Sequence, residues 1–352
     1  MHIEENVALE QANTFGIAAR ARALLRITHD EQLTALAQLP PEQARQWLAQ
    51  GFVVLGGGSN IILSGDVRPL VLKMENRGIA LVDEDSKHWI VQAAAGETWH
   101  DLVAWTLQQG YPGLENLALI PGSVGAAPVQ NIGAYGLELQ DRFHSLDAID
   151  ISTGCRMTLD AAQCGFGYRH SVFKQKGEGG LAGRAVITQV RLALPKSWRP
   201  ELGYADLQRK MAELKLPQPT AQQVFEMVVA IRRAKLPDPT VVGNAGSFFK
   251  NPVVSAKQCE DILGREPGIV HYRLPDGSVK LAAGWLIDAC GWRGKHMGNA
   301  GVYDKQALVL INRYAQTGVR ATGSEVMALA NAIQTSVYER FGVRLEMEPA
   351  VI

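Results

Sequence analysis

Short apolar runs alternate with helical stripes of apolar residues along most of this chain. Phe52–Leu55 and Val91–Ala95 are apolar runs that predict buried strands. Glu97–Gln109 carries leucine, valine and tryptophan at helical spacing and is followed by glycine, which is typical of a helix. Pro41–Gln50 begins with proline and also precedes glycine, so it predicts a short helix. The pattern therefore predicts a mixture of strands and helices.

The last third of the chain predicts an α+β domain with its own core. Thr220 and Gln223 have the spacing of a capping box, which opens a helix that runs to about residue 233. Thr322 and Glu325 repeat this spacing before a final helix with one apolar stripe. A further helix is expected at Leu281–Cys290, a buried strand at Gln306–Ile311 and a last strand at Val343–Met347.

Two longer stretches follow neither the hydrophobic pattern of a helix nor that of a strand. Pro195–Leu216, which contains Tyr204, is polar and predicts an irregular connection to a further domain. Gly113–Gly136 holds five glycines, two prolines and no charge other than Glu115, so it is too apolar for a surface linker and too interrupted for a helix. Long loops inside compact domains are usually functional. Small residues here would let a flat cofactor lie against the backbone, and a buried irregular connection is the alternative.

A glycine-rich loop, Gly56–Asn60, follows the first predicted strand directly. Successive backbone N–H groups in such a loop can converge on a phosphate. The dinucleotide fingerprint G-x-G-x-x-G fits Gly56 and Gly58, but its third position is Ile61, and the next residues predict a strand instead of a helix. A Rossmann fold is therefore not favoured, and a hairpin turn remains an alternative for these glycines.

The stretch Gly243–Pro252, Gly-Asn-Ala-Gly-Ser-Phe-Phe-Lys-Asn-Pro, carries the most concentrated candidate chemistry. Ser247 directly follows Gly246, so its hydroxyl could project from a tight turn. Lys250 and Asn251 could meet a phosphate or a sugar. The alternative is a glycine-rich turn in which the serine bonds its own backbone. Arg169 lies between aromatic and polar neighbours and is a further candidate. The alternative is that it forms only an ion pair at the surface.

Composition limits the possible classes. The 352 residues predict two or three domains, and the 47% hydrophobic content is ordinary for a globular protein. Lys and Arg together number 35, as do Asp and Glu, so no basic surplus indicates nucleic acid or an anionic membrane. No apolar run is long enough to span a membrane, and the acidic start is unlike a signal peptide. The four cysteines are widely spaced, which indicates reduced thiols in a cytoplasmic protein.

Several catalytic motifs are missing. The chain has no G-x-x-x-x-G-K-[ST], no H-E-x-x-H and no G-x-S-x-G, and its eight histidines show no ligand spacing. We therefore expect no metal site and no P-loop chemistry.

Taken together, seven stretches resemble the UDP-N-acetylenolpyruvoylglucosamine reductase family of peptidoglycan synthesis. They occur in the family's order over nearly the whole chain: Asn13–Gly16, Gly56–Asn60, Gly113–Gly136, Phe166–Arg169 (Phe-Gly-Tyr-Arg), Lys235–Pro239 (Lys-Leu-Pro-Asp-Pro), Gly243–Pro252 and Lys280–Asp288. The Tyr204 region places the chain near the longer family type, in which a tyrosine loop closes over the substrate.

The resemblance implies an α+β fold with a two-lobed FAD-binding domain of the vanillyl-alcohol-oxidase (PCMH) type and a C-terminal substrate-binding domain. We expect lobe 1 at 1–85, lobe 2 at 86–217, with the FAD-binding region at about 15–194, and the C-terminal domain at 218–352. It also implies non-covalent FAD, with NADPH as co-substrate. The reaction would reduce the enolpyruvyl ether of UDP-N-acetylglucosamine-enolpyruvate to the lactyl ether of UDP-N-acetylmuramate, for the cell wall and hence cell shape and division.

Site residues follow from the match to the family's motifs. Ser247 would be the proton donor, and Arg169 and Glu348 would stabilise the enolate that hydride transfer leaves. Cofactor contacts are expected at Gly56, Gly57, Gly58, Ser59, Asn60, Ile120, Pro121, Gly122, Ser123, Gly125, Ala126, Ala127, Gln130, Asn131, Gly133, Ala134, Tyr135 and Arg232. Contacts to the substrate's diphosphate and sugar are expected at Tyr204, Lys235, Asn251 and Gln306.

Two other functions compete with the reductase. One is an oxidase of the same flavin fold that passes electrons to oxygen, and the other is a flavin or nucleotide-sugar binding protein without catalysis. Ser247 favours the reductase, because an oxidase has no enolate carbon to protonate and binding alone needs no acid. We expect a monomer with no nucleic-acid or membrane partner.

Overall fold

The computed structural model describes residues 1–352, and the chain divides into two compact units. Unit 1 comprises Met1–Val7, Ala21–Gly57 and Val67–Ala234, and unit 2 comprises Ala8–Arg20, Gly58–Asp66 and Lys235–Ile352. The chain enters unit 2 twice, at residues 8–20 and 58–66, before it reaches the C-terminal segment.

Unit 1 contains two sheets. The strands of the first sheet, in spatial order, are β1 (Glu4–Ala8), β2 (Arg20–Ile27), β5 (Leu70–Met74) and β3 (Phe52–Leu55). Strand β5 is parallel to both of its neighbours, β2 and β3. The second sheet is antiparallel. Its strands, in spatial order, are β11 (Arg156–Asp160), β10 (Phe143–Asp150), β12 (Ala185–Pro195), β7 (His88–Ala94) and β6 (Ile79–Glu84). The predicted strand Phe52–Leu55 is confirmed.

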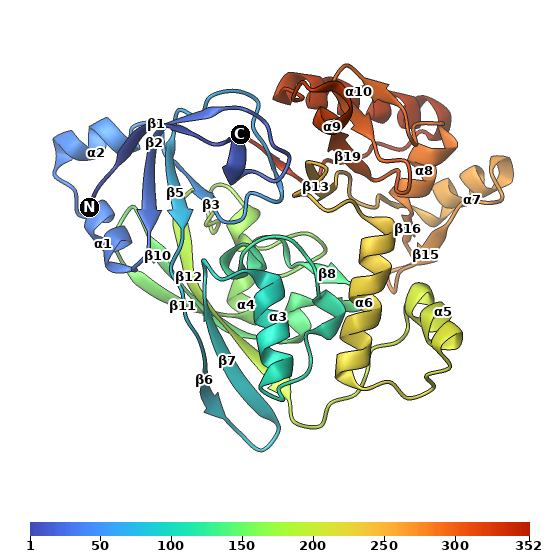
Figure 1. Ribbon diagram of the computed structural model, residues 1–352, viewed down its shortest axis with the longest axis horizontal. Coiled ribbons are helices and arrows are strands. Elements are labelled where there is room, and N and C mark those ends of the chain that lie inside the picture. Colours follow the sequence, from blue (N-terminus) through green and yellow to red (C-terminus); the bar gives the residue numbers. More distant parts are fainter. The chain divides into compact units, whose positions relative to one another are not determined.

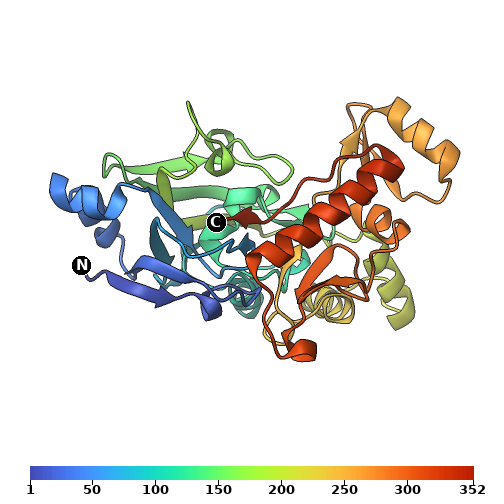
Figure 2. The ribbon, with the colours of Figure 1, turned by 90° about the horizontal axis from the view of Figure 1, so that it is seen from above.

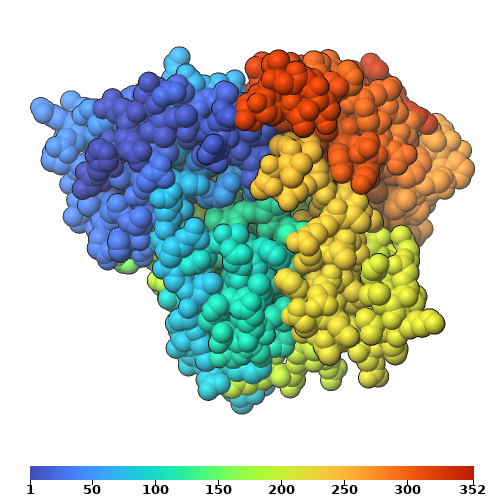
Figure 3. All heavy atoms as spheres, viewed as in Figure 1, coloured from blue at the N-terminus to red at the C-terminus, as the bar shows by residue number.

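The helices of unit 1 complete two hydrophobic cores. The smaller core joins α1 (Glu31–Ala37) to β2 and β5, with Leu33 and Leu36 fully buried. The larger core joins the antiparallel sheet to α3 (Trp99–Gln108) and α6 (Ala221–Lys235), which lie on the same side of that sheet (Figure 1). On the face seen in Figure 3, residues of α6 form part of the surface near those of α3. The remaining elements are α2 (Pro41–Leu48), α4 (Ala161–Cys164), α5 (Ala205–Leu214), β8 (Gly133–Ala134) and β9 (Leu137–Glu138).

Unit 2 is built on an antiparallel sheet. Its strands, in spatial order, are β13 (Asn244–Ser247), β19 (Val309–Asn312), β18 (Ala300–Val302) and β17 (His296–Met297). The long helix α10 (Gly323–Phe341) runs along this unit (Figure 2). It contacts β17, β18 and α8 (Ala283–Ala289). A smaller sheet has the order β14-β16-β15: Val253–Val254, Val279–Leu281 and His271–Arg273. The other elements are α7 (Ala256–Arg265), α9 (Tyr314–Thr317), β4 (Ile61–Ile62) and β20 (Ala350–Val351).

The helix starts predicted from capping patterns are confirmed. Thr322 and Glu325 exchange reciprocal hydrogen bonds at the start of α10, and Thr220 and Gln223 do so at the start of α6. Such caps satisfy N–H groups that have no partner within the helix. No helix is long and apolar enough to cross a membrane.

Three local predictions need correction. Pro195–Leu216 is not irregular throughout, because α5 occupies Ala205–Leu214. Gly113–Gly136 is not structureless, since it holds three short 3-10 helices and β8. Val343–Met347 is extended but is not a regular strand, and the terminal strand is β20, which pairs in parallel with β4. The predicted domain boundaries at 85 and 217 stay a prediction.

Candidate functional site

Two of the predicted cofactor loops pack directly against each other in unit 1. A Cβ atom added to Gly56 would lie 2.2 Å from the Ser123 hydroxyl oxygen, and one added to Gly57 would lie 2.9 Å from the Cα of Gly122. Glycine is required at position 57, because the obstacle there is the backbone of Gly122, whereas at position 56 the obstacle is the side chain of Ser123. The sequence signal of clustered glycines therefore has a physical cause, which is backbone-to-backbone packing of two loops.

The hydroxyl of Ser123 makes this pair of loops suited to a ligand. Its oxygen is buried and has no hydrogen-bond partner in the chain. Buried polar groups in native proteins are nearly always paired, so this oxygen fits a polar group of a bound molecule. The loops thus offer a glycine cradle and an unpaired hydroxyl, which is the donor set expected for a phosphate-bearing cofactor such as FAD.

A lysine that the sequence analysis did not single out lies behind the first loop. The Lys73 ammonium group, from β5, donates a hydrogen bond to the carbonyl oxygen of Gly56. Burial lowers the pKa of Lys73. The contact fixes one end of the loop, and nothing in the local sequence around Lys73 indicated it.

The second loop is fixed along β7 and α3. Gly122 accepts a hydrogen bond from the Trp99 N–H at 3.0 Å, and the N–H groups of Val124 and Gly125 donate to Glu97 and Ala95 at 2.8 and 2.9 Å. Gly125 itself must be glycine, because a Cβ there would lie 2.5 Å from that of Ala95. The predicted cofactor stretch is therefore held by backbone bonds at a rigid edge.

Leu119, immediately before that stretch, is held on both sides by side chains. Its φ is +58°, a left-handed conformation that is strained for leucine. Its N–H donates to Nδ1 of His100 at 3.0 Å, and its carbonyl accepts from Nε of Arg232 at 3.3 Å. Burial lowers the pKa of His100, and nearby Arg232 and Arg233 lower it further, which favours the neutral ring that can accept this bond. Arg232 thus contacts the entry to the cofactor stretch, and His100 was missed by sequence reasoning.

Tyr135 and Tyr204, predicted separately as cofactor and substrate contacts, meet in unit 1. Their rings lie edge to face with centroids 5.1 Å apart. Burial raises the pKa of Tyr135 to about 12, although Arg232 beside it acts in the opposite direction. The phenol is therefore neutral and can donate a hydrogen bond. Tyr204 is 44% exposed and immediately precedes α5.

Arg169 projects from a tight turn beside the same stretch. Its φ is +54°, and its flanking residues Gly167 and His170 exchange backbone hydrogen bonds at 3.1 Å. The guanidinium donates to the carbonyl oxygen of Gly133 at 3.2 Å and lies 5.3 Å from the centre of the Tyr168 ring. The structure therefore brings Arg169 next to the predicted cofactor residues Gly133 to Tyr135.

Ser247 ends β13 in unit 2 and is exposed. Gly246 before it has a φ of +70°, which a side chain would strain, and the pairing of β13 with β19 shifts register there. Phe248 and Phe249 after it are fully buried and stack edge to face. Two buried anchors and a bulge thus present the Ser247 hydroxyl outward, and this hydroxyl donates to no group of the chain.

The segment that carries the two terminal glutamates runs antiparallel beside this turn. The N–H of Glu348 donates to Phe248 and the N–H of Lys250 donates to Glu346, both at 2.9 Å. The side chain of Glu346 forms an ion pair with Lys250. Asn60, a predicted cofactor residue, donates through its side chain to the Glu348 carbonyl oxygen at 3.4 Å. Unit 2 therefore places Glu348 on the strand segment next to Ser247.

Asn251 and Gln306, both predicted substrate contacts, each lie close to the first turn of α8. The N–H of Ala283 donates to Oδ1 of Asn251 at 3.0 Å. A Cβ on Gly284 would lie 3.1 Å from Oε1 of Gln306. Lys235 is the last residue of α6 and begins the C-terminal segment of unit 2.

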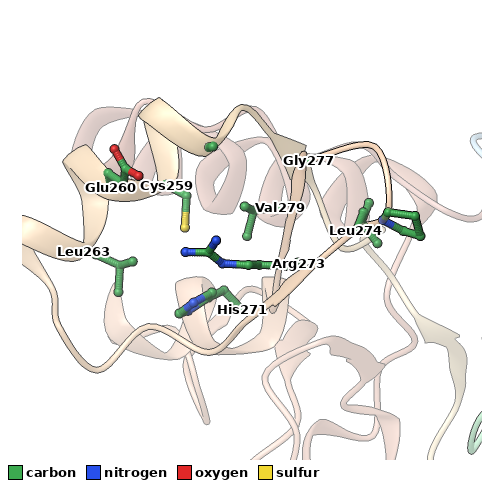
Figure 4. Close-up of a pocket in the computed structure, with 10 residues that line it drawn as sticks. Cys259, Glu260, Leu263, His271, Arg273, Leu274, Gly277 and Val279 are labelled. Carbon is green, nitrogen blue, oxygen red and sulfur yellow. The ribbon is translucent and has the colours of Figure 1, made fainter.

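A cavity of about 230 Å³ in unit 2 contains none of these residues. It lies between α7 and the β15–β16 hairpin, where Cys259, His271 and Arg273 point toward one another (Figure 4). Burial raises the pKa of Cys259, so this thiol stays protonated and is a poor nucleophile. The structure holds no group of His, Cys, Asp and Glu side chains that could bind a metal ion.

Comparison with known proteins gives a consistent result. A family model described as "FAD binding domain" matches residues 21–160, and one described as "UDP-N-acetylenolpyruvoylglucosamine reductase, C-terminal domain" matches residues 238–352. Relatives named UDP-N-acetylenolpyruvoylglucosamine reductase include one from Paraburkholderia phymatum, 54% identical over 98% of this chain and 96% of its own. Another, from Burkholderia cenocepacia, is 55% identical over 97% of this chain and 94% of its own.

A solved structure agrees at the level of the fold. The UDP-N-acetylenolpyruvylglucosamine reductase from Thermus caldophilus superposes with a TM-score of 0.66 at 24% identity, covering 100% of this chain and 99% of that one. The predicted fold class, an FAD-binding domain followed by a C-terminal domain of this family, is confirmed.

Proposed function

The chain belongs to the UDP-N-acetylenolpyruvoylglucosamine reductase family, and we propose here which of its residues carry out the reaction. It is an FAD-dependent oxidoreductase that reduces the enolpyruvyl ether of UDP-N-acetylglucosamine-enolpyruvate with electrons from NADPH. The product, UDP-N-acetylmuramate, serves peptidoglycan synthesis. The resemblance found in the sequence is thereby confirmed, and the oxidase and the non-catalytic binding protein are no longer favoured.

FAD held by the two loops would supply a hydride to C3 of the enolpyruvyl group, with NADPH as the source of the electrons. Addition of hydride at C3 leaves the electron pair of the double bond on C2 and its carboxylate. Ser247 donates a proton to C2, so that one hydride and one proton have been added across the double bond. Arg169, as a cation, and Glu348, as a protonated carboxyl group that donates a hydrogen bond, stabilise the developing negative charge and support Ser247 as an acid.

One observation carries the role of Ser247. Its hydroxyl is exposed, has no partner in the chain, and sits on a turn fixed by two fully buried phenylalanines. Serine hydroxyls in turns can bond to nearby backbone, and this one does not. A rigidly presented and unpaired hydroxyl is instead what proton donation to a bound substrate requires.

The cofactor and substrate contacts follow from the local geometry. We propose that Gly56 to Asn60 and the stretch from Ile120 to Tyr135 bind FAD, because packed glycines and the unpaired Ser123 hydroxyl fit its phosphates. Arg232 supports this stretch through Leu119. The residues proposed for the substrate's diphosphate and sugar are Tyr204, Lys235, Asn251 and Gln306.

The test of the function is the visible spectrum of the purified protein. A yellow protein that NADPH bleaches anaerobically, and that the enolpyruvyl nucleotide sugar restores, has the proposed activity. Restoration by oxygen alone, with no effect of the nucleotide sugar, would instead identify an oxidase. The chain is proposed to act as a monomer, which light scattering checks, and in the cytoplasm, because none of its four cysteines forms a disulfide.

A further inference from the structure

The connector between β12 and α5, residues 196–204, carries Tyr204 and contains no helix or strand. Such a segment would be mobile unless side chains held it. Two hydrogen bonds hold its middle. The indole N–H of Trp198 donates to Oε1 of Glu115 at 2.5 Å, and the carbonyl oxygen of Glu201 accepts from Nδ2 of Asn116 at 2.8 Å. The connector is therefore tied to two adjacent residues.

Glu115 and Asn116 form a rigid base for these bonds. Both belong to a 3-10 helix, Glu115–Leu117, whose three residues are at most 2% exposed. Oε2 of Glu115 accepts from the Gly113 N–H at 2.7 Å, and the Leu117 carbonyl accepts from the indole of Trp99 at 2.9 Å. The carboxyl group of Glu115 is thus held inside an otherwise apolar stretch by two donors, one of which comes from the connector.

Asn116 also joins the connector to the second tyrosine. Its Nδ2 donates to the carbonyl oxygen of Tyr135 at 2.8 Å, in addition to that of Glu201. Tyr135 has a φ of +51°, which is strained for a side chain and needs support from its surroundings. One amide therefore fixes the backbone of Tyr135 and the segment just before Tyr204. The two rings then meet edge to face at 5.1 Å.

We propose that Glu115 and Asn116 are positioning residues for the substrate, which act by holding Tyr204 against Tyr135. This rests on the proposed contact of Tyr204 with the substrate. Without the two bonds the connector samples more conformations, and binding of the nucleotide sugar must then order it. The penalty appears as weaker substrate binding, while reduction of the flavin by NADPH does not depend on it.

The direct test is Asn116→Leu, which keeps a similar volume and removes both donors. Substrate affinity is measured by titrating the oxidised holoenzyme with the nucleotide sugar and following the flavin absorbance. Loss of one or two buried hydrogen bonds predicts a rise in the substrate Kd of about tenfold or more. The rate of flavin reduction by NADPH shows whether loss of the bond to Tyr135 also disturbs the FAD-binding stretch. Trp198→Phe leaves that bond in place, so this variant should keep the rate within about twofold of the parent enzyme.

Asn76 provides the matched control for general damage. It is also a buried asparagine of unit 1, and it bridges the Thr188 carbonyl at 2.8 Å and the Gly96 N–H at 2.9 Å. Asn76→Leu should lower the melting temperature as Asn116→Leu does, but leave the substrate Kd unchanged. If both variants change the Kd equally, Asn116 is only structural and the proposal is wrong.

A double-mutant cycle shows whether Asn116 acts through Tyr204. Tyr204→Ala should weaken substrate binding, and adding Asn116→Leu to it should weaken binding no further. Fully additive effects overturn the positioning role while leaving the Tyr204 contact intact. An unchanged Kd in Tyr204→Ala overturns that contact and the positioning role with it.

Trp198→Phe keeps the test decisive if Asn116→Leu does not fold. This variant retains an aromatic ring and removes only the indole donor to Glu115. It should raise the substrate Kd severalfold. Glu115→Gln keeps one acceptor oxygen, so it should raise the substrate Kd less than Glu115→Leu does. A parent-like Kd in Trp198→Phe would refute the proposal.

Discussion

Ser247→Ala should separate the two halves of the reaction without disturbing the fold. The side chain is exposed and its hydroxyl bonds to nothing in the chain, and its backbone does not have a positive φ. Alanine therefore fits, and removal of the hydroxyl leaves no buried group unpaired. The change in the free energy of unfolding should stay within about 0.5 kcal/mol, as for ordinary surface substitutions.

The effect on the substrate half-reaction should be far larger. General acids contribute about 10²–10⁴-fold in rate, which corresponds to roughly 3–5 kcal/mol of barrier. Because no second donor is proposed at C2, we expect the loss in Ser247→Ala to exceed this range. Flavin reduction by NADPH should remain nearly intact, since it involves no proton transfer to the substrate.

The assay is anaerobic stopped-flow absorbance of the flavin, with NADPH and with the nucleotide sugar in separate experiments. Ser255→Ala is the control serine, because its hydroxyl caps α7 by accepting the N–H of Gln258 at 3.2 Å. This control should lose about 0.5–2 kcal/mol of stability and change neither half-reaction. Equal slowing of both half-reactions in Ser247→Ala, or a loss of stability like that of the control, would refute the reasoning.

Three further predictions follow from the same geometry. Glu348→Gln should slow reoxidation of the flavin by substrate, whereas Glu346→Gln, which only loses the ion pair with Lys250, should change neither half-reaction; the opposite result in stopped-flow would show that the assignment is wrong. Acid precipitation should release all yellow colour into the supernatant, because FAD is bound without a covalent link; colour in the pellet would contradict this. The pKa of His100 is lowered from 6.5 in the folded protein, so the unfolded chain binds more protons below about pH 6.5 and stability should fall as the pH decreases. Urea unfolding should show a weaker decline in His100→Gln, whose neutral side chain does not titrate, and an identical decline would exclude His100 as its source.

Local features of the structure could be predicted because their causes are local. The capping bonds of Thr322 and of Thr220 join residues three apart, and their spacing is visible in the sequence. The glycines at 56 and 57 predicted a phosphate-binding loop or a hairpin turn, and only the structure shows that this loop packs against residues 122–123. Glu115 was visible as the single charge of an apolar stretch, but its indole partner lies 83 positions away.

Errors arose where tertiary contacts outweighed local patterns. Val343–Met347 alternates like a strand, and Val343 and Leu345 are indeed buried, but the segment forms only an isolated bridge with Phe249. The terminal strand forms later, at β20, because β4 offers a partner there. Strand identity depends on a neighbour, which periodicity alone does not reveal.

The sequence by itself determined the family, the helix caps, the glycine loops and the residue types available for chemistry. Tertiary structure decided which of them share a unit. Residues 8–20 and 58–66 join the C-terminal segment through bonds such as that of the Thr14 hydroxyl to the Asn244 carbonyl at 2.7 Å, between positions 230 apart. Asn116 likewise acquires its role only where two distant carbonyls converge on one amide. Propensities and caps act over a few residues, whereas such pairings form when the whole chain folds, because they depend on burial and on the geometry of segments that are remote in sequence.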